Sequence, residues 1–179
     1  GKKNTALAMQ IEAILQGLAN ASFLAFPAFI ISTNPSEEIS IFEIIGMIIW
    51  IISFIMESVA DVQKLTYLRA MKKSDARNMV CNIGLWKYSR HPNYFSEWMV
   101  WNALVIASIP SWLNLYPNIS VLIFTLVGVG LLLTSRIMYI TLVTYTGAIP
   151  SEYYSVQKRP AYKDYQQTTN MFFPGPTKN

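Results

Sequence analysis

The chain has 179 residues, the length of one domain, and a formal net charge of +4. Apolar residues make up 53% of it and charged residues only 13%, about half the charged fraction of an ordinary soluble protein. This composition excludes a typical soluble globular protein and predicts an integral membrane protein. Because Cys81 is the single cysteine, it also excludes an intramolecular disulfide.

Four apolar stretches predict an all-α fold of about four membrane-spanning helices, since a helix needs about 20 residues to cross the hydrocarbon. We expect these spans at 6–31, 41–60, 94–110 and 119–142. The first is interrupted by polar residues and by Pro27, which should kink it, so it should face protein or a cavity rather than lipid. The third is short and should stop at Pro110.

The positions of the fourteen basic residues predict the orientation. Two precede the first span, seven lie between the second and third, and four follow the last, whereas the connections 32–40 and 111–118 carry none. This distribution matches the positive-inside rule with both termini on the inner side. The exception, Arg136, either snorkels to the inner face or points into the bundle. If the source is eukaryotic, we expect the endoplasmic reticulum or the mitochondrial inner membrane.

The second span ends in two carboxylates. Glu57 and Asp61 are four residues apart, so they share a helix face and repel each other without cations or hydroxyls nearby. Two interpretations stay open. They form a solvated pair at the membrane edge, or they accept hydrogen bonds from ligand hydroxyls or amides, or orient Arg90.

The stretch 84–98 concentrates polar groups at the mouth of an apolar helix. It holds the only histidine, His91, beside a cation, a proline, an amide, several aromatic rings and a carboxylate. Such hydrogen-bonding capacity is costly there unless something polar binds. A structural role for His91 is the alternative. One histidine and one cysteine cannot form a metal cluster, so no metal is expected. The basic loop is explained by topology and anionic headgroups rather than by nucleic acid.

The tail, 151–170, places four tyrosines among charges and predicts one or two short interfacial helices. We expect a break at Pro160 and a return toward the loop 61–93, with Phe172-Phe173-Pro174 pinning the end. The 57–64 segment, the 84–97 loop and the tail then form a polar pocket at the inner membrane face. Arg90 is suited to bidentate binding of phosphate, and the flat rings of Trp86, Tyr88 and Tyr94 suit a base. The apolar spans behind the pocket suit a lipid-like substrate.

Several spaced motifs occur in a recognisable order. They are Gln16-Gly17 with Pro27; Glu57, Asp61, Gln63 and Lys64; Gly84-Leu85-Trp86, Tyr88, Ser89-Arg90-His91-Pro92-Asn93-Tyr94-Phe95 and Glu97; and Arg159-Pro160, Tyr162, Tyr165, Thr168 and Phe172-Phe173-Pro174. Together they resemble the steroid 5α-reductase-like membrane family, in its broad bacterial and protist branch. The resemblance covers nearly the whole chain as a single membrane domain, 1–179. It matches the C-terminal, cofactor-binding part of the family, and we expect the N-terminal helices of full members to be absent.

The resemblance implies an NADPH-dependent reductase of a carbon–carbon double bond conjugated to a carbonyl, in a steroid or other lipid. It implies that Asp61, Asn93 and Glu97 hold the nicotinamide–ribose end, that Arg90, His91 and nearby basic residues contact phosphates, and that tyrosines close the pocket. No catalytic residue is assigned. The expected cofactor-binding residues are Glu57, Asp61, Lys64, Trp86, Tyr88, Ser89, Arg90, His91, Asn93, Tyr94, Glu97, Tyr162 and Tyr165.

Two departures from the family keep other hypotheses open. Ser96 stands where the family usually has glycine, and we expect the helices that precede this region in full members to be missing. A second hypothesis is therefore a non-catalytic accessory subunit of a larger membrane complex, with other membrane subunits as partners and no cofactor. A third is an isoprenylcysteine-type methyltransferase, which shares Arg-His-Pro-x-Tyr and binds S-adenosylmethionine. The set Glu57, Asp61, Gln63 and Lys64 favours the reductase over the third.

Overall fold

The computed structural model describes residues 7, 10–11, 14, 17–18, 24–74 and 79–178. Across these residues the regular elements are helices and no strand is present, which confirms the predicted all-α class. The α-helices are α2 (Phe26–Ser32), α3 (Ile41–Lys73), α4 (Pro92–Ala107), α5 (Ile109–Leu115), α6 (Val121–Ile140), α7 (Ala148–Lys158) and α8 (Tyr162–Thr168). They are joined in part by two short 3₁₀ turns, η2 (Gly84–Lys87) and η3 (Tyr116–Asn118), and a π-helical turn, η4 (Thr141–Tyr145).

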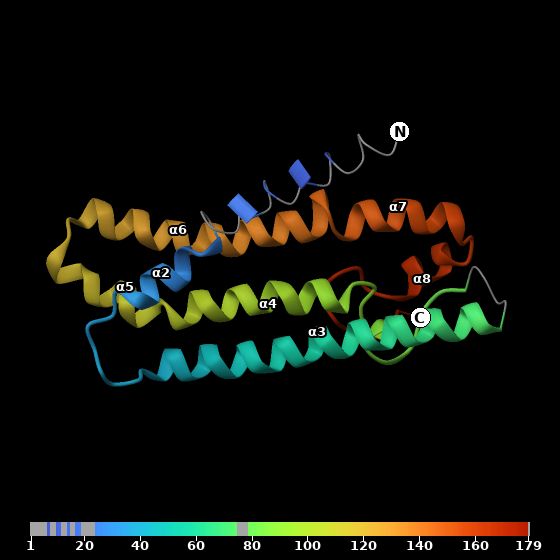
Figure 1. Cartoon of the computed structure of the whole chain (residues 1–179), viewed down its shortest axis with the longest axis horizontal. Helices are drawn as coiled ribbons and strands as arrows, with labels where there is room; N and C mark the ends of the chain where they lie inside the picture. The colour runs from blue at the N-terminus through green and yellow to red at the C-terminus, as the bar shows by residue number, and fades with distance from the viewer. Residues whose placement is uncertain are drawn as a thin grey trace.

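Helix α4 lies between α3 and α6 and packs against both (Figure 1). The approach between α3 and α4 is close at Gly46. A Cβ atom there would lie 2.7 Å from the carbonyl oxygen of Ala103 and 2.8 Å from the Cβ of Ala107. Small residues let helix backbones approach each other, which is a common packing device in membranes. Gly46 therefore fixes the distance between the two helices that carry Glu57, Asp61, Asn93 and Glu97.

Two helices are long and apolar enough to cross a membrane. They are α3 and the segment Val121–Lys158, which comprises α6, η4 and α7. Only 11% of the most apolar window of α3 is buried, so its apolar side chains face outward, where lipid can cover them. This supports the predicted membrane protein. Four spans and the inner position of both termini stay predictions, because α4 has only 16 residues and the predicted span 6–31 lies partly outside the described residues.

Two prolines begin helices. Helix α4 ends at Ala107, and Pro110 lies in the first turn of α5, so the prediction that the third span runs to Pro110 is corrected. Pro27 likewise lies in the first turn of α2. A proline is well placed there because the first N–H groups of a helix have no partner within the helix. The interruption expected at Pro27 is thus a helix start.

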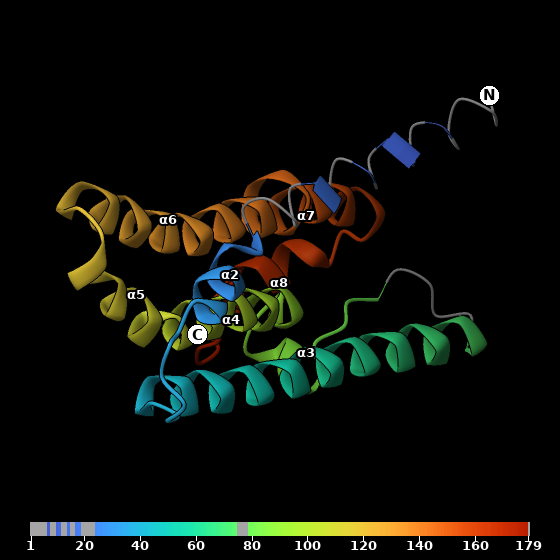
Figure 2. The same ribbon diagram turned by 60° about the vertical axis from the view of Figure 1, so that its left-hand side comes forward.

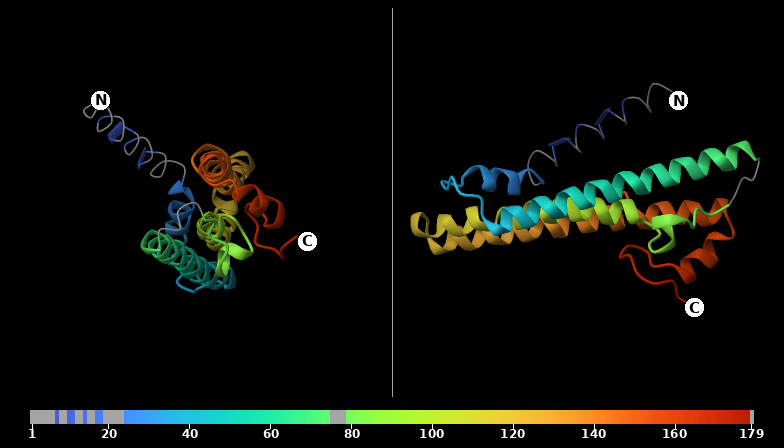
Figure 3. Two further views of the ribbon diagram at one scale, coloured as in Figure 1. Left: turned by 90° about the vertical axis from the view of Figure 1, so that its right-hand side faces the viewer. Right: turned by 90° about the horizontal axis from the view of Figure 1, so that it is seen from below.

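The tail folds back as predicted. Pro160 separates α7 from α8, and Figure 2 shows α8 turned inward from α7 toward α4. The segment after α8 meets the loop 84–91 that precedes α4, called here the signature loop. There the N–H of Arg90 donates to the carbonyl of Asn170 (2.8 Å), and the N–H of Gly175 donates to the carbonyl of Tyr88 (3.0 Å). Figure 3 shows the C-terminal segment at the same end of the molecule as α7.

An aromatic cluster anchors this tail to the bundle. Phe172 is only 2% exposed, and its ring meets those of Phe95 on α4 and Tyr139 on α6 edge-on, with centroids 5.9 Å and 5.2 Å away. Trp98 adds another edge-on contact to Phe172 at 6.0 Å and donates from its indole N–H to the carbonyl of Ser135 (3.1 Å). Aromatic pairs of this kind stabilise beyond their area burial, so the prediction that the Phe172 segment pins the end is confirmed.

Candidate functional site

The guanidinium of Arg90, at the start of α4, is bound inside the protein. Its Nε donates to Oε1 of Glu152 on α7 (2.7 Å) and its Nη2 to Oε2 of the same carboxylate (3.1 Å). Its Nη1 donates to the carbonyl oxygens of Gln166 (2.9 Å) and Thr169. A guanidinium carries five N–H groups. Four of those of Arg90 donate to acceptors within the chain.

Glu152 is the centre of this buried network. Its carboxylate also meets Nε2 of His91 (3.0 Å) and accepts from Nε2 of Gln166 (2.6 Å), and the residue is only 6% exposed. Burial raises the pKa of Glu152, but the hydrogen bonds from His91, Arg90 and Gln166 outweigh it and lower the pKa to about 2. The carboxylate is therefore charged at neutral pH, and it joins α7, α8 and the start of α4.

The residues just before α4 also hold the tail. The hydroxyl of Ser89, which is fully buried, donates to the carbonyl of Phe172 (2.9 Å) and accepts from the N–H of His91 (3.1 Å). The hydroxyl of Tyr165 on α8 donates to the carbonyl of Trp86. Burial raises the pKa of the Tyr165 phenol above its usual range, so this donor keeps its proton. Many of the hydrogen-bonding groups of this loop therefore bind other parts of the chain rather than a ligand.

A second group of polar side chains lies between α3 and α4. Asn93 Nδ2 donates to Oδ1 of Asp61 (3.1 Å), and Asn93 Oδ1 is buried with no hydrogen-bond partner in the part of the chain that the structure describes. The carboxylates of Glu57, Asp61 and Glu97 lie close enough for their charges to repel one another. This group, called here the acceptor cluster, consists of Glu57, Asp61, Asn93 and Glu97. Its carboxylate and amide oxygens are hydrogen-bond acceptors, so a ligand with hydrogen-bond donors would suit it.

The thirteen predicted site residues separate into two groups with a link. One group is buried and packed with the tail: Trp86, Ser89, Arg90, His91, Tyr162 and Tyr165. The other is the acceptor cluster. Tyr94 links them, because its ring stacks on His91 at a centroid distance of 5.3 Å. Lys64 lies over the ring of Trp86 with Nζ 4.0 Å from the centroid, whereas the Tyr88 side chain is 50% exposed. Their assignment to a cofactor stays a prediction.

Sequence reasoning missed the residues that bind Arg90. Glu152 and Gln166 lie 62 and 76 residues beyond Arg90 in the chain, within a tail where charged and polar residues are frequent. The one sequence signal was the acidic residue Glu152 in a short amphipathic helix. Such a residue alone does not indicate which group it binds. The departure at Ser96 is accommodated, because its buried hydroxyl donates to the carbonyl of Pro92 (2.9 Å) one turn earlier.

The family follows from a comparison with known proteins. A family model described as "Protein of unknown function (DUF1295)" matches residues 2–169. The chain belongs to this family. No curated protein and no solved structure matches it. The DUF1295 match covers both site groups but assigns no activity to them, so the more specific resemblance to steroid reductases is argued below as a proposal.

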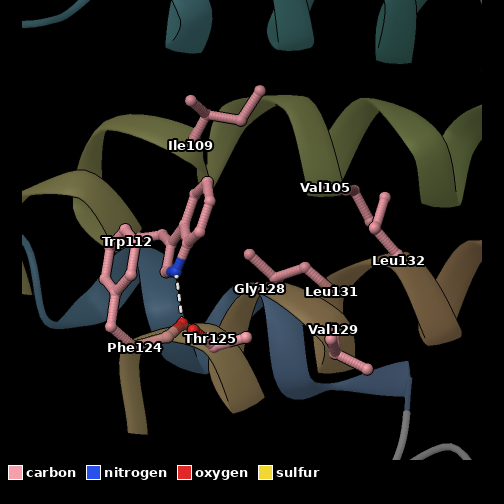
Figure 4. A pocket seen from close by; sticks show the side chains of 9 residues that line it. All are labelled: Val105, Ile109, Trp112, Phe124, Thr125, Gly128, Val129, Leu131 and Leu132. Atoms are coloured by element: carbon pink, nitrogen blue, oxygen red, sulfur yellow. Dashed lines mark hydrogen bonds between the residues drawn. The ribbon is translucent and has the colours of Figure 1, made fainter. Parts of the chain in front are cut away.

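The DUF1295 chain also has an apolar groove at the opposite end of α4, between α5 and α6 (Figure 4). Its volume is about 380 Å³ and its lining is nearly all apolar. Trp112 and Phe124 form one end of it, with rings stacked 4.5 Å apart and the indole N–H donating to the carbonyl of Phe124 (2.9 Å). The polar atom at this end is thus satisfied, and the groove suits hydrocarbon rather than a nucleotide.

Proposed function

We propose that this chain is a membrane reductase that uses NADPH to reduce a carbon–carbon double bond conjugated to a carbonyl in a steroid or other lipid-like substrate. The observation that carries the proposal is the amide of Asn93. Its N–H bonds to Asp61, while its oxygen is buried without a partner among the described residues. Leaving such an acceptor unsatisfied costs about 1–3 kcal/mol, so a ligand that donates there binds favourably.

The residues of the acceptor cluster fit the nicotinamide–ribose end of the cofactor. A carboxamide N–H₂ and ribose hydroxyls are donors, and Asn93 and Asp61 offer acceptors between the two packed helices α3 and α4. The acidic side chains of Glu57 and Glu97 add acceptors for hydroxyls. When bound, NADPH supplies the hydride that reduces the double bond. The motif set that resembles the reductases contains every member of this cluster.

In this proposal Arg90 and His91 are positioning residues. Because Glu152 accepts two of the four bonded donors of Arg90 and also meets His91, the role of Arg90 and His91 is to fix the first turn of α4, from which Asn93 and Glu97 project. The expectation from resemblance, direct contact of both residues with phosphate, requires them to leave this network. The group that polarises the substrate carbonyl stays unassigned.

One observation favours a second candidate, an isoprenylcysteine-type methyltransferase. Three carboxylates lie together in the acceptor cluster, and in the described part of the chain none of them forms an ion pair. S-adenosylmethionine carries a sulfonium and an ammonium group, both of which a cluster of carboxylates attracts. The sequence Arg90-His91-Pro92-Asn93-Tyr94 also matches the Arg-His-Pro-x-Tyr element of those enzymes.

A titration of the detergent-purified protein separates the candidates. We expect NADPH to bind in the micromolar range or tighter, with affinity that weakens as salt is added, and S-adenosylmethionine not to bind. Binding of S-adenosylmethionine alone overturns the reductase in favour of the methyltransferase. Binding of neither, with stable co-purification of other membrane subunits, overturns both in favour of the accessory subunit.

A further inference from the structure

A second apolar groove lies between α3 and α4. Its volume is about 240 Å³, its lining is nearly all apolar, and its walls include Met47 and Trp50 on α3 and Leu104 on α4. Gly46 and Ala103 also line it, and the helices touch there, since a Cβ on Gly46 would lie 2.7 Å from the carbonyl oxygen of Ala103. The groove is therefore closed by backbone at its base. It opens toward the surface of the bundle, where Met47 and Trp50 are 56% and 39% exposed.

This groove and the acceptor cluster lie along one interface. Helices α3 and α4 run antiparallel (Figure 1), and they meet at two fixed points. Gly46 contacts Ala107 at one end, and Asp61 accepts from Asn93 at the other (3.1 Å). These contacts are about 22 Å apart along α3 and about 21 Å apart along α4. Because the two lengths agree, the helices keep the same register from one contact to the other.

Helix periodicity places the groove and the cluster on the same face of each helix. Trp50 precedes Glu57 by seven residues, and Leu104 follows Glu97 by seven, which is close to two helical turns. About 10 Å along the axis separates the members of each pair. The groove between α5 and α6 lacks this relation, because Val105, which lines it, is rotated about 100° from Leu104 around α4.

The size and the opening of the α3–α4 groove define what it can hold. It opens on the exposed apolar side of α3, where membrane lipid can enter it. Pockets for compact, drug-sized ligands have volumes of about 300–1,000 Å³. A volume of about 240 Å³ is too small for a fused-ring body and suits part of a single hydrocarbon chain. The flexible thioether of Met47 adapts readily to such a chain.

We propose that this groove binds the hydrocarbon chain of an open-chain lipid whose polar head lies at the acceptor cluster. The identity of the head rests on the proposed function, under which it is a carbonyl with a conjugated double bond beside the nicotinamide. The substrate is then a long-chain α,β-unsaturated lipid rather than a steroid. The β-carbon receives the hydride of NADPH and the α-carbon a proton from solvent, which yields the saturated carbonyl compound and NADP⁺.

The experiment follows contact between the chain and Trp50 by fluorescence. The probe is a long-chain α,β-unsaturated methyl ketone with bromine near the end of its chain, because bromine quenches indole emission on contact. The protein in detergent is titrated without NADPH, and the same titration of Trp50→Phe isolates the signal of Trp50. Met47→Phe/Leu104→Phe fills the groove. Ile48→Phe/Leu122→Phe is the matched control, since these side chains are 50% and 69% exposed and do not line the groove.

We expect quenching of Trp50 to saturate. The half-saturating probe concentration should rise about tenfold or more in the groove-filled variant and stay unchanged in the control. Quenching that rises without saturation, or equal half-saturation of the two double variants, overturns the groove as a chain site. On the unchanged protein, an unbrominated long-chain enone should displace the probe and progesterone, a fused-ring enone, should not. Equal displacement by progesterone overturns the open-chain assignment.

A parallel titration with NADPH separates this inference from the proposed function. Saturable quenching of Trp50 in a protein that binds no NADPH overturns the reductase and leaves the chain site standing. Binding of NADPH without saturable quenching overturns the chain site and leaves the reductase standing.

Discussion

Arg90 and Glu152, 62 residues apart in the chain, form a bidentate buried ion pair with contacts of 2.7 and 3.1 Å. Truncating one partner of such a pair leaves a buried charge without compensation, at a cost of about 3–5 kcal/mol. The pair also fixes the first turn of α4 against α7 and α8. Its integrity is therefore a condition for the geometry of the acceptor cluster.

Glu152→Gln should lower stability by about 3 kcal/mol or more and release the tail. Limited proteolysis should then cleave around α8 faster than in the unchanged protein. Asp164→Asn is the matched control, because this exposed carboxylate lies on α8 and forms no ion pair in the described chain. Equal cleavage rates of the two variants contradict the structural role of Glu152.

Stability should also fall in acid because of Glu152. Its pKa is lowered to about 2 in the folded protein, so the stabilisation is fully present above the pKa of about 4.3 that an unfolded glutamate has. It is lost progressively as the pH falls from there toward 2. Melting temperatures measured from pH 7 to pH 3 should decline for the unchanged protein, and the decline should be smaller for Glu152→Gln. Parallel curves argue against a depressed pKa at this residue.

Tyr165→Phe should destabilise the protein by about 1 kcal/mol, the net value of one hydrogen bond. The change removes the donor to the carbonyl of Trp86, a buried acceptor that ties α8 to the signature loop. Tyr153→Phe is the control, since its side chain is 65% exposed. The difference in thermal stability between the two variants measures the bond, and a difference of zero means that Tyr165 only fills space.

Gly46→Ala should destabilise the contact of α3 with α4 by about 1–3 kcal/mol. The added Cβ would meet a backbone oxygen of Ala103 at 2.7 Å, which a side-chain rotation cannot relieve. Gly17→Ala has no atom within 4 Å of its Cβ, so it should be neutral or slightly stabilising. Melting temperatures of the two glycine variants test this difference in stability. If Gly46→Ala is as stable as Gly17→Ala, the two helices are less closely packed than described.

The sequence sufficed to predict features that depend on neighbouring residues. Apolar length predicted helices, Pro160 predicted the break between α7 and α8, and the aromatic ending around Phe172 predicted an anchor. The end of the third span at Pro110 was predicted wrongly, because a proline is compatible with the start of a helix as well as with its end.

The partners of buried polar groups were not predictable in the same way. The donors of Arg90 suggested an external anion, but buried polar groups usually find partners within the chain, and Glu152 and Gln166 fold back to supply them. Long-range pairing of this kind depends on the tertiary path of the tail. Asn93 and Asp61, by contrast, were grouped correctly from their motifs, and the structure brings them within 3.1 Å.

The most direct test of the central claim is the dissociation constant of NADPH for Asn93→Leu, compared with Asn114→Leu. Both changes remove an amide, but Asn114 lies on α5 at the far end of the bundle, where it bonds to Asn34. If the acceptor cluster binds the nicotinamide–ribose end, Asn93→Leu should weaken NADPH binding about tenfold or more while Asn114→Leu leaves it unchanged. Equal affinity of the two variants for NADPH would contradict the account.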